Sequence, residues 1–344
     1  MMHENLLYVY SFFIAVLISV IFTPICRFLA IKLNILDGPT TKIKTHKVSI
    51  PYLGGIAIAF AWILSLLLIR VITSFPTLTL RNLRGIIFGA FMMLIVGLFD
   101  DIRKGGLGFK PKLVIQFLSA SIIVFLFNIR MDFIPIYWLS CLISIFWIMG
   151  ITNAFNIIDI MDGLSSGIAV IASFTFLFIS LSTQMRYINF CSVALAGALL
   201  GFMPYNFSVS KKIFMGDTGS LFVGFVVACI SLGTSYSSVS NIGLFAPVFV
   251  LAIPIYETFL VSICRIQKGI LPFIGSKDHY ALRLSKMGFS KKQILINTYI
   301  ACLFFSVCAY LFTTLSMFSA LLLFIAVGIL MWGISITLVS VKVE

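Results

Sequence analysis

The chain has 344 residues, of which 61% are hydrophobic and only 10% are charged, and its formal net charge is +13. Soluble domains carry about 25% charged residues, so this composition excludes a soluble protein and places most of the chain in lipid. Nucleic-acid-binding proteins are also basic, but their charge lies on a soluble surface. Here the Lys and Arg residues occupy short segments between apolar runs, so we expect a membrane protein that binds no nucleic acid.

Apolar runs that could cross a bilayer, for which a helix needs about 20 residues, recur along the whole chain. In chain order we predict eleven transmembrane helices: Leu6–Ile31, Leu53–Ile72, Gly85–Phe99, Leu113–Asn128, Ile134–Ile151, Leu164–Leu181, Ile188–Phe207, Ser220–Thr234, Ile242–Cys264, Ile294–Leu315 and Phe318–Val341. The third and eighth runs are short, and the division at Ser316 allows only a tight turn. The expected fold is an all-α, polytopic transmembrane bundle of about 10–11 helices, with residues 1–344 forming a single domain.

Basic residues are unevenly distributed among the predicted loops. If the N-terminus is outside, the inside loops hold most of the 24 Lys and Arg residues, and the outside holds only Arg70, Arg81, Arg84, Arg130 and Arg186. Cytoplasmic loops of membrane proteins are enriched in Lys and Arg, which predicts an N-terminus outside and a C-terminus inside. The longest connection, residues 267–293, then lies in the cytoplasm and is long enough to contribute to a site there.

Aspartates gather where the predicted helices meet the cytoplasm. Asp100 and Asp101 end the third apolar run, and Asn156, Asp159 and Asp162 follow the fifth at a three-residue spacing. On a helix this spacing keeps the three side chains near one face. Ionisable groups close to the membrane are costly and are usually functional, although each segment alone is also explained as a solvated helix end or an N-cap.

A further aspartate, Asp217, lies in Phe214-Met-Gly-Asp-Thr-Gly-Ser at the start of the eighth run. Glycines allow close approach of the backbone, and a helix N-terminus favours phosphate. Basic side chains of other inside segments would face the same region: Lys47, Lys112, His279 and Arg283. Taken singly, such residues more often set membrane orientation than bind a ligand.

Carboxylate and amide oxygens are hard ligands, which indicates Mg²⁺, or Mn²⁺ as the alternative, rather than zinc or copper. Carboxylates, a divalent metal and cationic side chains together suit phosphoryl transfer, where positioning and charge neutralisation dominate. A site at the cytoplasmic boundary of the membrane would take one substrate from the cytosol and the other from the lipid.

At these residues the chain resembles the polyprenyl-phosphate N-acetylhexosamine-1-phosphate transferases of glycosyltransferase family 4, which include WecA-, TagO- and MraY-type enzymes. The matching stretches are Pro51-Tyr-Leu-Gly-Gly55, the Asp100-Asp101 pair, Asn153-Ala-Phe-Asn-Ile-Ile-Asp-Ile-Met-Asp-Gly-Leu164, Phe214-Met-Gly-Asp-Thr-Gly-Ser-Leu221, and Pro254-Ile-Tyr-Glu-Thr258 followed by Arg265. They occur in the family's order and cover most of residues 40–290.

The resemblance implies a reaction in which a UDP-sugar and polyprenyl (undecaprenyl) phosphate give polyprenyl-diphosphate-sugar and UMP, with Mg²⁺. This would be the first membrane step of a cell-envelope glycan pathway, at the inner or plasma membrane. By position, Asp217 would be the principal metal ligand, with Asn156 beside it, and Asp100 and Asp101 would lie at the lipid phosphate, one of them as a base.

The other roles that the resemblance implies concern the donor. Asp159 would be catalytic beside the nucleotide, Asp162 would contact uracil, and Phe214 would stack on it. Lys47 and Lys112 would face phosphates. His279 and Arg283 would serve the sugar diphosphate, although the clustered histidines of many members are missing around them. We also consider a second copy of the chain as a partner.

Three alternatives stay open at this point. An MraY-like enzyme would transfer phospho-N-acetylmuramoyl-pentapeptide, and the missing histidine cluster argues against it. A secondary transporter also buries charges, but it would place them near the middle of the membrane and often shows two related halves. A scaffolding protein without chemistry would not need acids gathered at one edge. We expect a UDP-N-acetylhexosamine as the donor.

Overall fold

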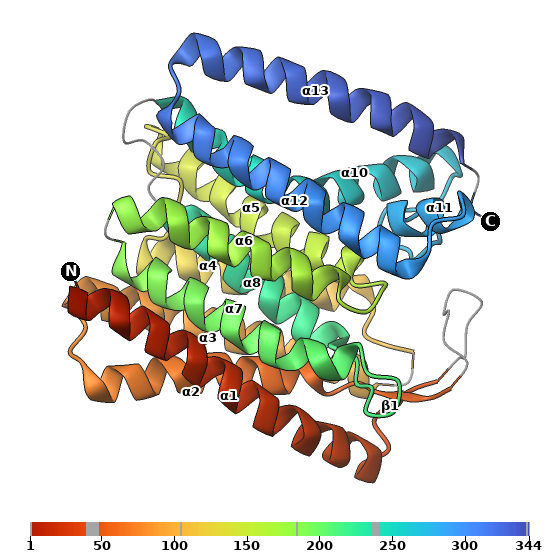
Figure 1. Cartoon of the computed structure of the whole chain (residues 1–344), viewed down its shortest axis with the longest axis horizontal. Helices are drawn as coiled ribbons and strands as arrows, with labels where there is room; N and C mark the ends of the chain where they lie inside the picture. The colour runs from red at the N-terminus through yellow and green to blue at the C-terminus, as the bar shows by residue number, and fades with distance from the viewer. Residues whose placement is uncertain are drawn as a thin grey trace. The chain divides into compact units, whose positions relative to one another are not determined.

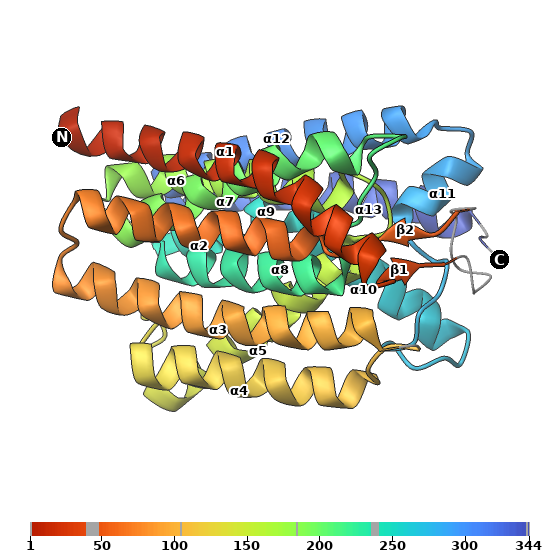
Figure 2. The ribbon, with the colours of Figure 1, turned by 90° about the horizontal axis from the view of Figure 1, so that it is seen from below.

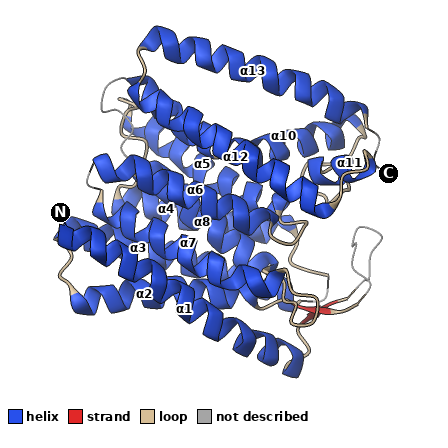
Figure 3. Ribbon diagram, in the orientation of Figure 1, coloured by secondary structure: helices blue, strands red, loops and turns tan. Residues whose placement is uncertain are grey.

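The computed structural model describes residues 2–38, 48–103, 105–183, 185–234, 241–341 and 343, and most of these lie in helices (Figure 1, Figure 3). They separate into two compact units, which are described one at a time. The first holds the described residues of Met1–Thr40 and His46–Thr234, and the second those of Ser235–Glu344. Within the described residues, ten helices are long and apolar enough to cross a membrane. The prediction of an all-α, polytopic membrane protein is confirmed.

The first unit is a bundle of long helices, with α8 at its centre (Figure 2). α8 contacts α2, α3, α5, α6 and α7, so other helices of the unit surround it. The helices of this unit are α1 (Met2–Lys32), α2 (Gly54–Ile72), α3 (Thr77–Ile102), α4 (Phe109–Phe127), α5 (Tyr137–Ile158), α6 (Leu164–Ser182), α7 (Arg186–Asn206) and α8 (Gly216–Gly233).

Two of these helices differ in length from the predicted runs. α3 begins at Thr77, well before the predicted start at Gly85, and it continues through Asp100 and Asp101. α8 begins at Gly216 and therefore includes Asp217 in its first turn. Both short predicted runs extend into their flanking polar segments, so Asp100, Asp101 and Asp217 lie on helices. The expectation that Asn156, Asp159 and Asp162 share one helix face is wrong, because α5 ends at Ile158 and the two aspartates follow it.

A small antiparallel sheet joins α1 to α2. It pairs β1 (Leu36–Asp37) with β2 (Ile50–Pro51). The chain after β2 is fastened to the segment before α8: Phe214 N donates to Pro51 O (2.8 Å), Gly54 N to Phe214 O (3.1 Å) and Gly55 N to Met215 O (2.9 Å). A Cβ on Gly55 would collide with the backbone of Gly219, which explains why glycine is needed where α2 meets α8.

The second unit contains a 3₁₀ turn and five helices among its described residues: η1 (Asn241–Phe245), α9 (Ala246–Val250), α10 (Ala252–Gln267), α11 (Tyr280–Lys286), α12 (Lys291–Thr314) and α13 (Met317–Ser340). The predicted span over Ile242–Cys264 is bent in the structure: the chain turns by 65° between Gly243–Val250 and Ala252–Gln267, and the two pieces together are still long and apolar enough to form one broken span. Pro254 explains the break, since a proline ring clashes with the carbonyl four residues earlier, and that residue is Val250, the last of α9.

The division between the last two helices is confirmed. Ser316 forms the N-cap of α13 by accepting a hydrogen bond from Ser319 N. At the start of α12, Ser290 and Gln293 form a capping box, in which each side chain bonds the other residue's backbone N–H. These polar caps specify where each of the two apolar helices begins.

Candidate active site

Three carboxylates meet at one end of the first unit. Asp100 and Asp101 come from the last turn of α3, and Asp217 comes from the first turn of α8. Each offers one oxygen, and these three oxygens all lie within 4.8 Å of one another. The sequence therefore correctly grouped two segments that are more than a hundred residues apart. Like charges this close repel unless a cation or a proton lies among them.

Asp101 caps the N-terminus of α8. Its Oδ1 accepts from Asp217 N (3.0 Å), and its Oδ2 accepts from Thr218 N (3.0 Å) and Thr218 Oγ1 (2.6 Å). The first N–H groups of a helix have no partner within the helix, and a carboxylate there also interacts favourably with the helix dipole. Both oxygens of Asp101 are thus used to hold the turn that carries Asp217.

Lys112, near the start of α4, supplies the positive charge of this cluster. Its Nζ lies 2.9 Å from Asp100 Oδ1 and 2.6 Å from Asp217 Oδ2, and its side chain is only 18% exposed. Asp100 Oδ1 also accepts a hydrogen bond of 2.5 Å from Leu107 N, in the connection between α3 and α4. The lysine predicted to face phosphates is therefore in direct contact with both acids.

Asn156 reaches the same cluster from α5. Its Nδ2 donates to Ser220 Oγ, in α8, over 2.9 Å, and its side chain also interacts with the carboxylate of Asp217. The structure thus brings together two residues that were predicted as metal ligands. Four helices, α3, α4, α5 and α8, contribute to this cluster.

Asp159 lies just after α5 and is partly buried. Burial raises the pKa of its carboxyl group well above the usual range, and the negative charges of Asp217, Asp101 and Asp162 raise it further.

Tyr52, beyond β2, is a residue that sequence reasoning missed. Burial, and then Asp37, raises the pKa of its hydroxyl, with smaller contributions from Asp101 and Asp217.

Asp162 and Phe214 lie close to a lysine that was not predicted as a site residue. Lys212 Nζ is 2.6 Å from Asp162 Oδ2 and 5.5 Å from the centre of the Phe214 ring. The buried Asn206 connects the two segments, because its Oδ1 accepts from Gly163 N (2.7 Å) and its Nδ2 donates to Ile213 O (3.0 Å). The only sequence signal for Lys212 was its position two residues before Phe214.

Within the second unit, Glu257 and His279 form a buried pair. His279 Nδ1 lies 2.7 Å from Glu257 Oε1, and Tyr280 N donates to Glu257 Oε2 over 3.1 Å. The ring nitrogen that faces a carboxylate is normally the one that carries the proton. Glu257 therefore orients the His279 ring, a role that the sequence did not suggest although its motif was recognised.

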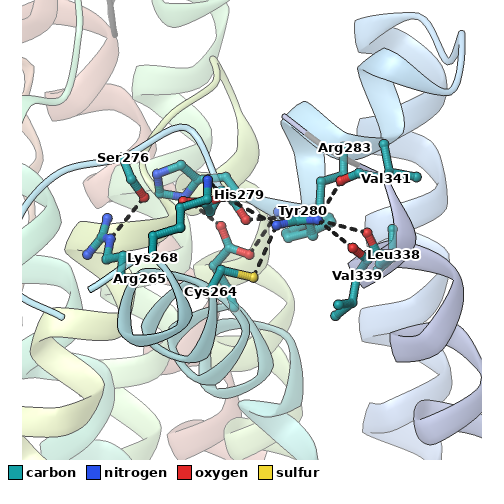
Figure 4. Close-up of polar contacts among 12 residues, drawn as sticks. Cys264, Arg265, Lys268, Ser276, His279, Tyr280, Arg283, Leu338, Val339 and Val341 are labelled. Atoms are coloured by element: carbon teal, nitrogen blue, oxygen red, sulfur yellow. Dashed lines mark hydrogen bonds and ion pairs between the residues drawn. The ribbon is translucent and has the colours of Figure 1, made fainter. Parts of the chain in front are cut away.

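Arg283 is buried, and its guanidinium contacts Cys264 and the end of α13 (Figure 4). Its Nη1 donates to the carbonyl oxygens at the end of α13, namely Leu338 (3.0 Å), Val339 (3.3 Å) and Val341 (2.6 Å). Its Nη2 lies 3.3 Å from Asp278 Oδ1, which also pairs with Lys268 at 2.7 Å. The guanidinium of Arg283 is therefore bound by groups of the second unit itself.

One predicted site residue, Lys47, lies outside the described residues. The roles of the other residues in substrate or metal binding stay predictions. What the geometry provides in the first unit is a set of converging carboxylates with one lysine between them, and a second charged pair beside an aromatic ring.

Comparison with known proteins identifies the family. The model of glycosyl transferase family 4 matches residues 83–235. The chain is 33% identical to a probable undecaprenyl-phosphate N-acetylglucosaminyl 1-phosphate transferase of Bacillus subtilis (strain 168), over 88% of this chain and 84% of that protein. It is 26% identical to a decaprenyl-phosphate N-acetylglucosaminephosphotransferase of Mycobacterium leprae (strain TN), over 83% of this chain and 79% of that protein.

A third relative is named for the other activity that was considered from the sequence. The chain is 35% identical to a phospho-N-acetylmuramoyl-pentapeptide-transferase of Limosilactobacillus reuteri (strain DSM 20016), over 57% of this chain and 64% of that protein. The match to the Bacillus subtilis protein extends over most of both chains. This multi-pass membrane protein therefore belongs to glycosyl transferase family 4, a family of transferase enzymes.

Proposed function

We propose that the protein transfers a sugar 1-phosphate from a UDP-N-acetylhexosamine to polyprenyl phosphate, at the cytoplasmic face of the membrane. The observation that carries this proposal is the convergence of Asp100, Asp101 and Asp217 in a protein whose relatives are named for transfer to undecaprenyl or decaprenyl phosphate. The products would be polyprenyl-diphosphate-sugar and UMP.

The carboxylate cluster fits a magnesium ion. Its ligand atoms are oxygens from three acids within 4.8 Å of one another, and Mg²⁺ prefers one or two carboxylates together with substrate phosphates. Asp217 would be the principal ligand, with Asn156 beside it. When bound, the ion would neutralise charge on the donor diphosphate.

In the reaction, an oxygen of the lipid phosphate attacks the phosphorus that bears the sugar. The bond from this phosphorus to the oxygen shared with the UMP phosphate breaks, and its electron pair leaves with UMP. Asp100 is the candidate base, because both oxygens of Asp101 already accept hydrogen bonds from α8. When substrate binds, Lys112 would give up its contacts with Asp100 and Asp217 and pair with phosphate oxygens instead.

The remaining predicted residues belong to the donor. Asp162 would accept a hydrogen bond from uracil, and Phe214 would stack on the base. Asp159 would act close to the nucleotide. In the second unit, His279 would contact the donor, oriented by Glu257, and Arg283 would act through the structure around it rather than by touching the donor.

A phospho-N-acetylmuramoyl-pentapeptide donor is the second candidate, because one relative is named for that substrate. The two candidates differ only in the donor, and both would release UMP. Membership of a transferase family favours either of them over the transporter considered from the sequence.

A donor screen tests the proposal directly. Purified protein in detergent is mixed with undecaprenyl phosphate, Mg²⁺ and one UDP-sugar at a time, and the release of UMP is measured. We expect release with a UDP-N-acetylhexosamine and none without the lipid phosphate. Release with the muramoyl-pentapeptide donor alone would select the second candidate. A folded protein that releases no UMP with any donor would contradict the proposal.

A further inference from the structure

The pair formed by Asp162 and Lys212 places a hydrogen-bond acceptor next to a donor. Asp162 Oδ2 and Lys212 Nζ are 2.6 Å apart, and the two side chains are 19% and 26% exposed. A carboxylate offers only acceptors and an ammonium offers only donors. Each group keeps hydrogen-bonding capacity beyond the contact that they share, so the pair presents both functions to a neighbouring molecule.

The backbone on both sides of this pair is fixed. Asn206, which is 5% exposed, bonds Gly163 N on one side and Ile213 O on the other. Arg27 of α1 donates from Nε to Lys212 O (3.2 Å) and from Nη2 to Ser210 O (3.3 Å). An ordinary surface ion pair is mobile and contributes little, whereas here the neighbouring structure holds both partners in register.

An aromatic ring completes the arrangement. Lys212 Nζ lies 5.5 Å from the centre of the Phe214 ring, and the Phe214 backbone bonds Pro51 and Gly54. Lys212 Nζ lies over the face of the Phe214 ring, so a flat ligand that stacks on that face would bring its polar edge within reach of the Lys212 ammonium and of its partner Asp162. Stacking alone does not distinguish one base from another, because every base has a π-face. Any discrimination would have to come from the edge.

The edge of uracil matches the pair. Uracil carries an N3–H donor beside the C4 carbonyl acceptor, so N3–H would face the Asp162 carboxylate and the carbonyl would face the Lys212 ammonium. Cytosine carries the reverse pattern, an N3 acceptor beside an N4 amino donor. It would oppose acceptor to acceptor and donor to donor, and such mismatched groups lose far more binding than a missing contact does.

From these contacts we propose that Lys212 is a specificity-determining residue, which reads the C4 carbonyl oxygen of the donor's base and, with Asp162, selects uracil over cytosine. This inference rests on the proposed function, because it takes the Asp162–Phe214 region as the place of the base. It adds a residue that has no role in the phosphoryl-transfer steps described above.

The test is the ratio of UMP to CMP affinity, measured by calorimetry on the purified full-length protein in detergent. We expect Lys212→Met to weaken UMP binding by about tenfold or more, the loss expected from one charge-assisted hydrogen bond, and to leave CMP binding unchanged or slightly stronger. Lys212→Arg keeps a cationic donor and should retain the preference. Lys211→Met is the matched control, because Lys211 is adjacent and exposed and its removal changes the net charge equally.

Two results would overturn the proposal. An unchanged UMP-to-CMP ratio in Lys212→Met would show that Lys212 does not read the base. An equal loss of affinity for UMP and CMP would show that Lys212 acts on the phosphate. Binding of uridine and cytidine, which have no phosphate, would check this independently. If Lys212→Met does not fold, Lys212→Ala, which also removes the donor, takes its place. UMP release by the wild-type protein tests the proposed function separately, so failure of one is distinguishable from failure of the other.

Discussion

Asp101 Oδ2 lies 2.6 Å from Thr218 Oγ1, and the Asp101 carboxylate also accepts hydrogen bonds from the backbone N–H groups of Thr218 and Asp217. An acid at the end of α3 thereby caps the start of α8. This contact determines where the Asp217 carboxylate lies relative to Asp100 and Lys112. Adjacent acids in the sequence, Asp100 and Asp101, consequently have different tasks.

This difference predicts different outcomes for two variants. Asp101→Asn should lower both activity and thermal stability, because an amide replaces a charged acceptor at the N-terminus of α8 and turns an NH₂ group toward its N–H donors. Loss of such a cap costs about 1–2 kcal/mol, or several degrees in Tm. Asp217→Asn should abolish UMP release while Tm stays close to wild type. Equal stability of the two variants in a thermal unfolding assay would contradict the assigned cap.

Removal of divalent cations should stop the reaction without unfolding the protein. Lys112 already pairs with Asp100 and Asp217, so the carboxylates do not depend on a metal for all of their charge balance. We expect EDTA to eliminate UMP release, Mg²⁺ to restore it, and Tm to change by no more than a few degrees. UMP release that persists in EDTA would remove the metal from the proposed mechanism.

Asp159 should make the protein less stable as the pH rises. Its pKa is raised in the folded protein by burial and by Asp217, Asp101 and Asp162, whereas in an unfolded chain it is about 3.9. Folding therefore favours the protonated form, and the associated stability is complete below about pH 4 and is lost as the pH rises toward the folded-state pKa. Asp159→Asn, which cannot ionise, should match wild type near pH 4 and have a higher Tm than wild type at neutral pH.

The measurement is thermal unfolding of both proteins in EDTA across that pH range. Activity provides a second readout. At neutral pH, Asp159→Asn should be more stable than wild type but less active, because the ionisable group costs stability and serves the reaction. A Tm difference that is the same at every pH would show that ionisation of Asp159 does not contribute to it.

Arg283 should affect stability more than substrate affinity. Its guanidinium contacts Asp278 and three carbonyl groups at the end of α13, so Arg283→Ala leaves a buried carboxylate with one cationic partner fewer. Breaking a buried ion pair costs about 3–5 kcal/mol. We expect lower Tm and faster proteolysis near the C-terminus, with an unchanged KM for the donor in the protein that remains folded. A raised KM at normal Tm would instead assign Arg283 to the donor.

Cysteine labelling checks the predicted orientation. All seven native cysteines are buried, so the background should be low. Ser74 and Ser210 are exposed in the structure, and the charge distribution predicts them outside and inside, respectively. A membrane-impermeant maleimide should label Ser74→Cys in intact cells and Ser210→Cys only after permeabilisation. The reverse pattern would invert the topology and move the carboxylates to the other face.

Hydrophobic patterning was sufficient to predict most of the helices. The bend between α9 and α10 was missed, because both halves are apolar and hydrophobic patterning alone joins them into one run. The start of α3 was also misplaced, since Thr77–Leu83 is too polar to resemble a span although it is helical.

The carboxylate cluster could be predicted because Asp100, Asp101 and Asp217 each border an apolar run, so the sequence placed all three at ends of helices. Lateral contacts were not predictable in this way. In the sequence, Lys211 and Lys212 are indistinguishable as neighbouring basic residues in one loop. In the structure Lys212 contacts Asp162, and Asn206 holds the two segments together by bonding Gly163 N and Ile213 O. Likewise, Glu257 was part of a recognised motif, but its pairing with His279 depends on the fold of the second unit.

Lys112 has a consequence for biogenesis. A chain being inserted into a bilayer must bring its acids to the membrane boundary before any substrate is present, and unbalanced carboxylates there would resist assembly of the bundle. Lys112 lies on α4 and is a counter-ion that the polypeptide itself supplies. A counter-ion within the polypeptide would let the bundle form before a metal ion binds, with the acids already in place.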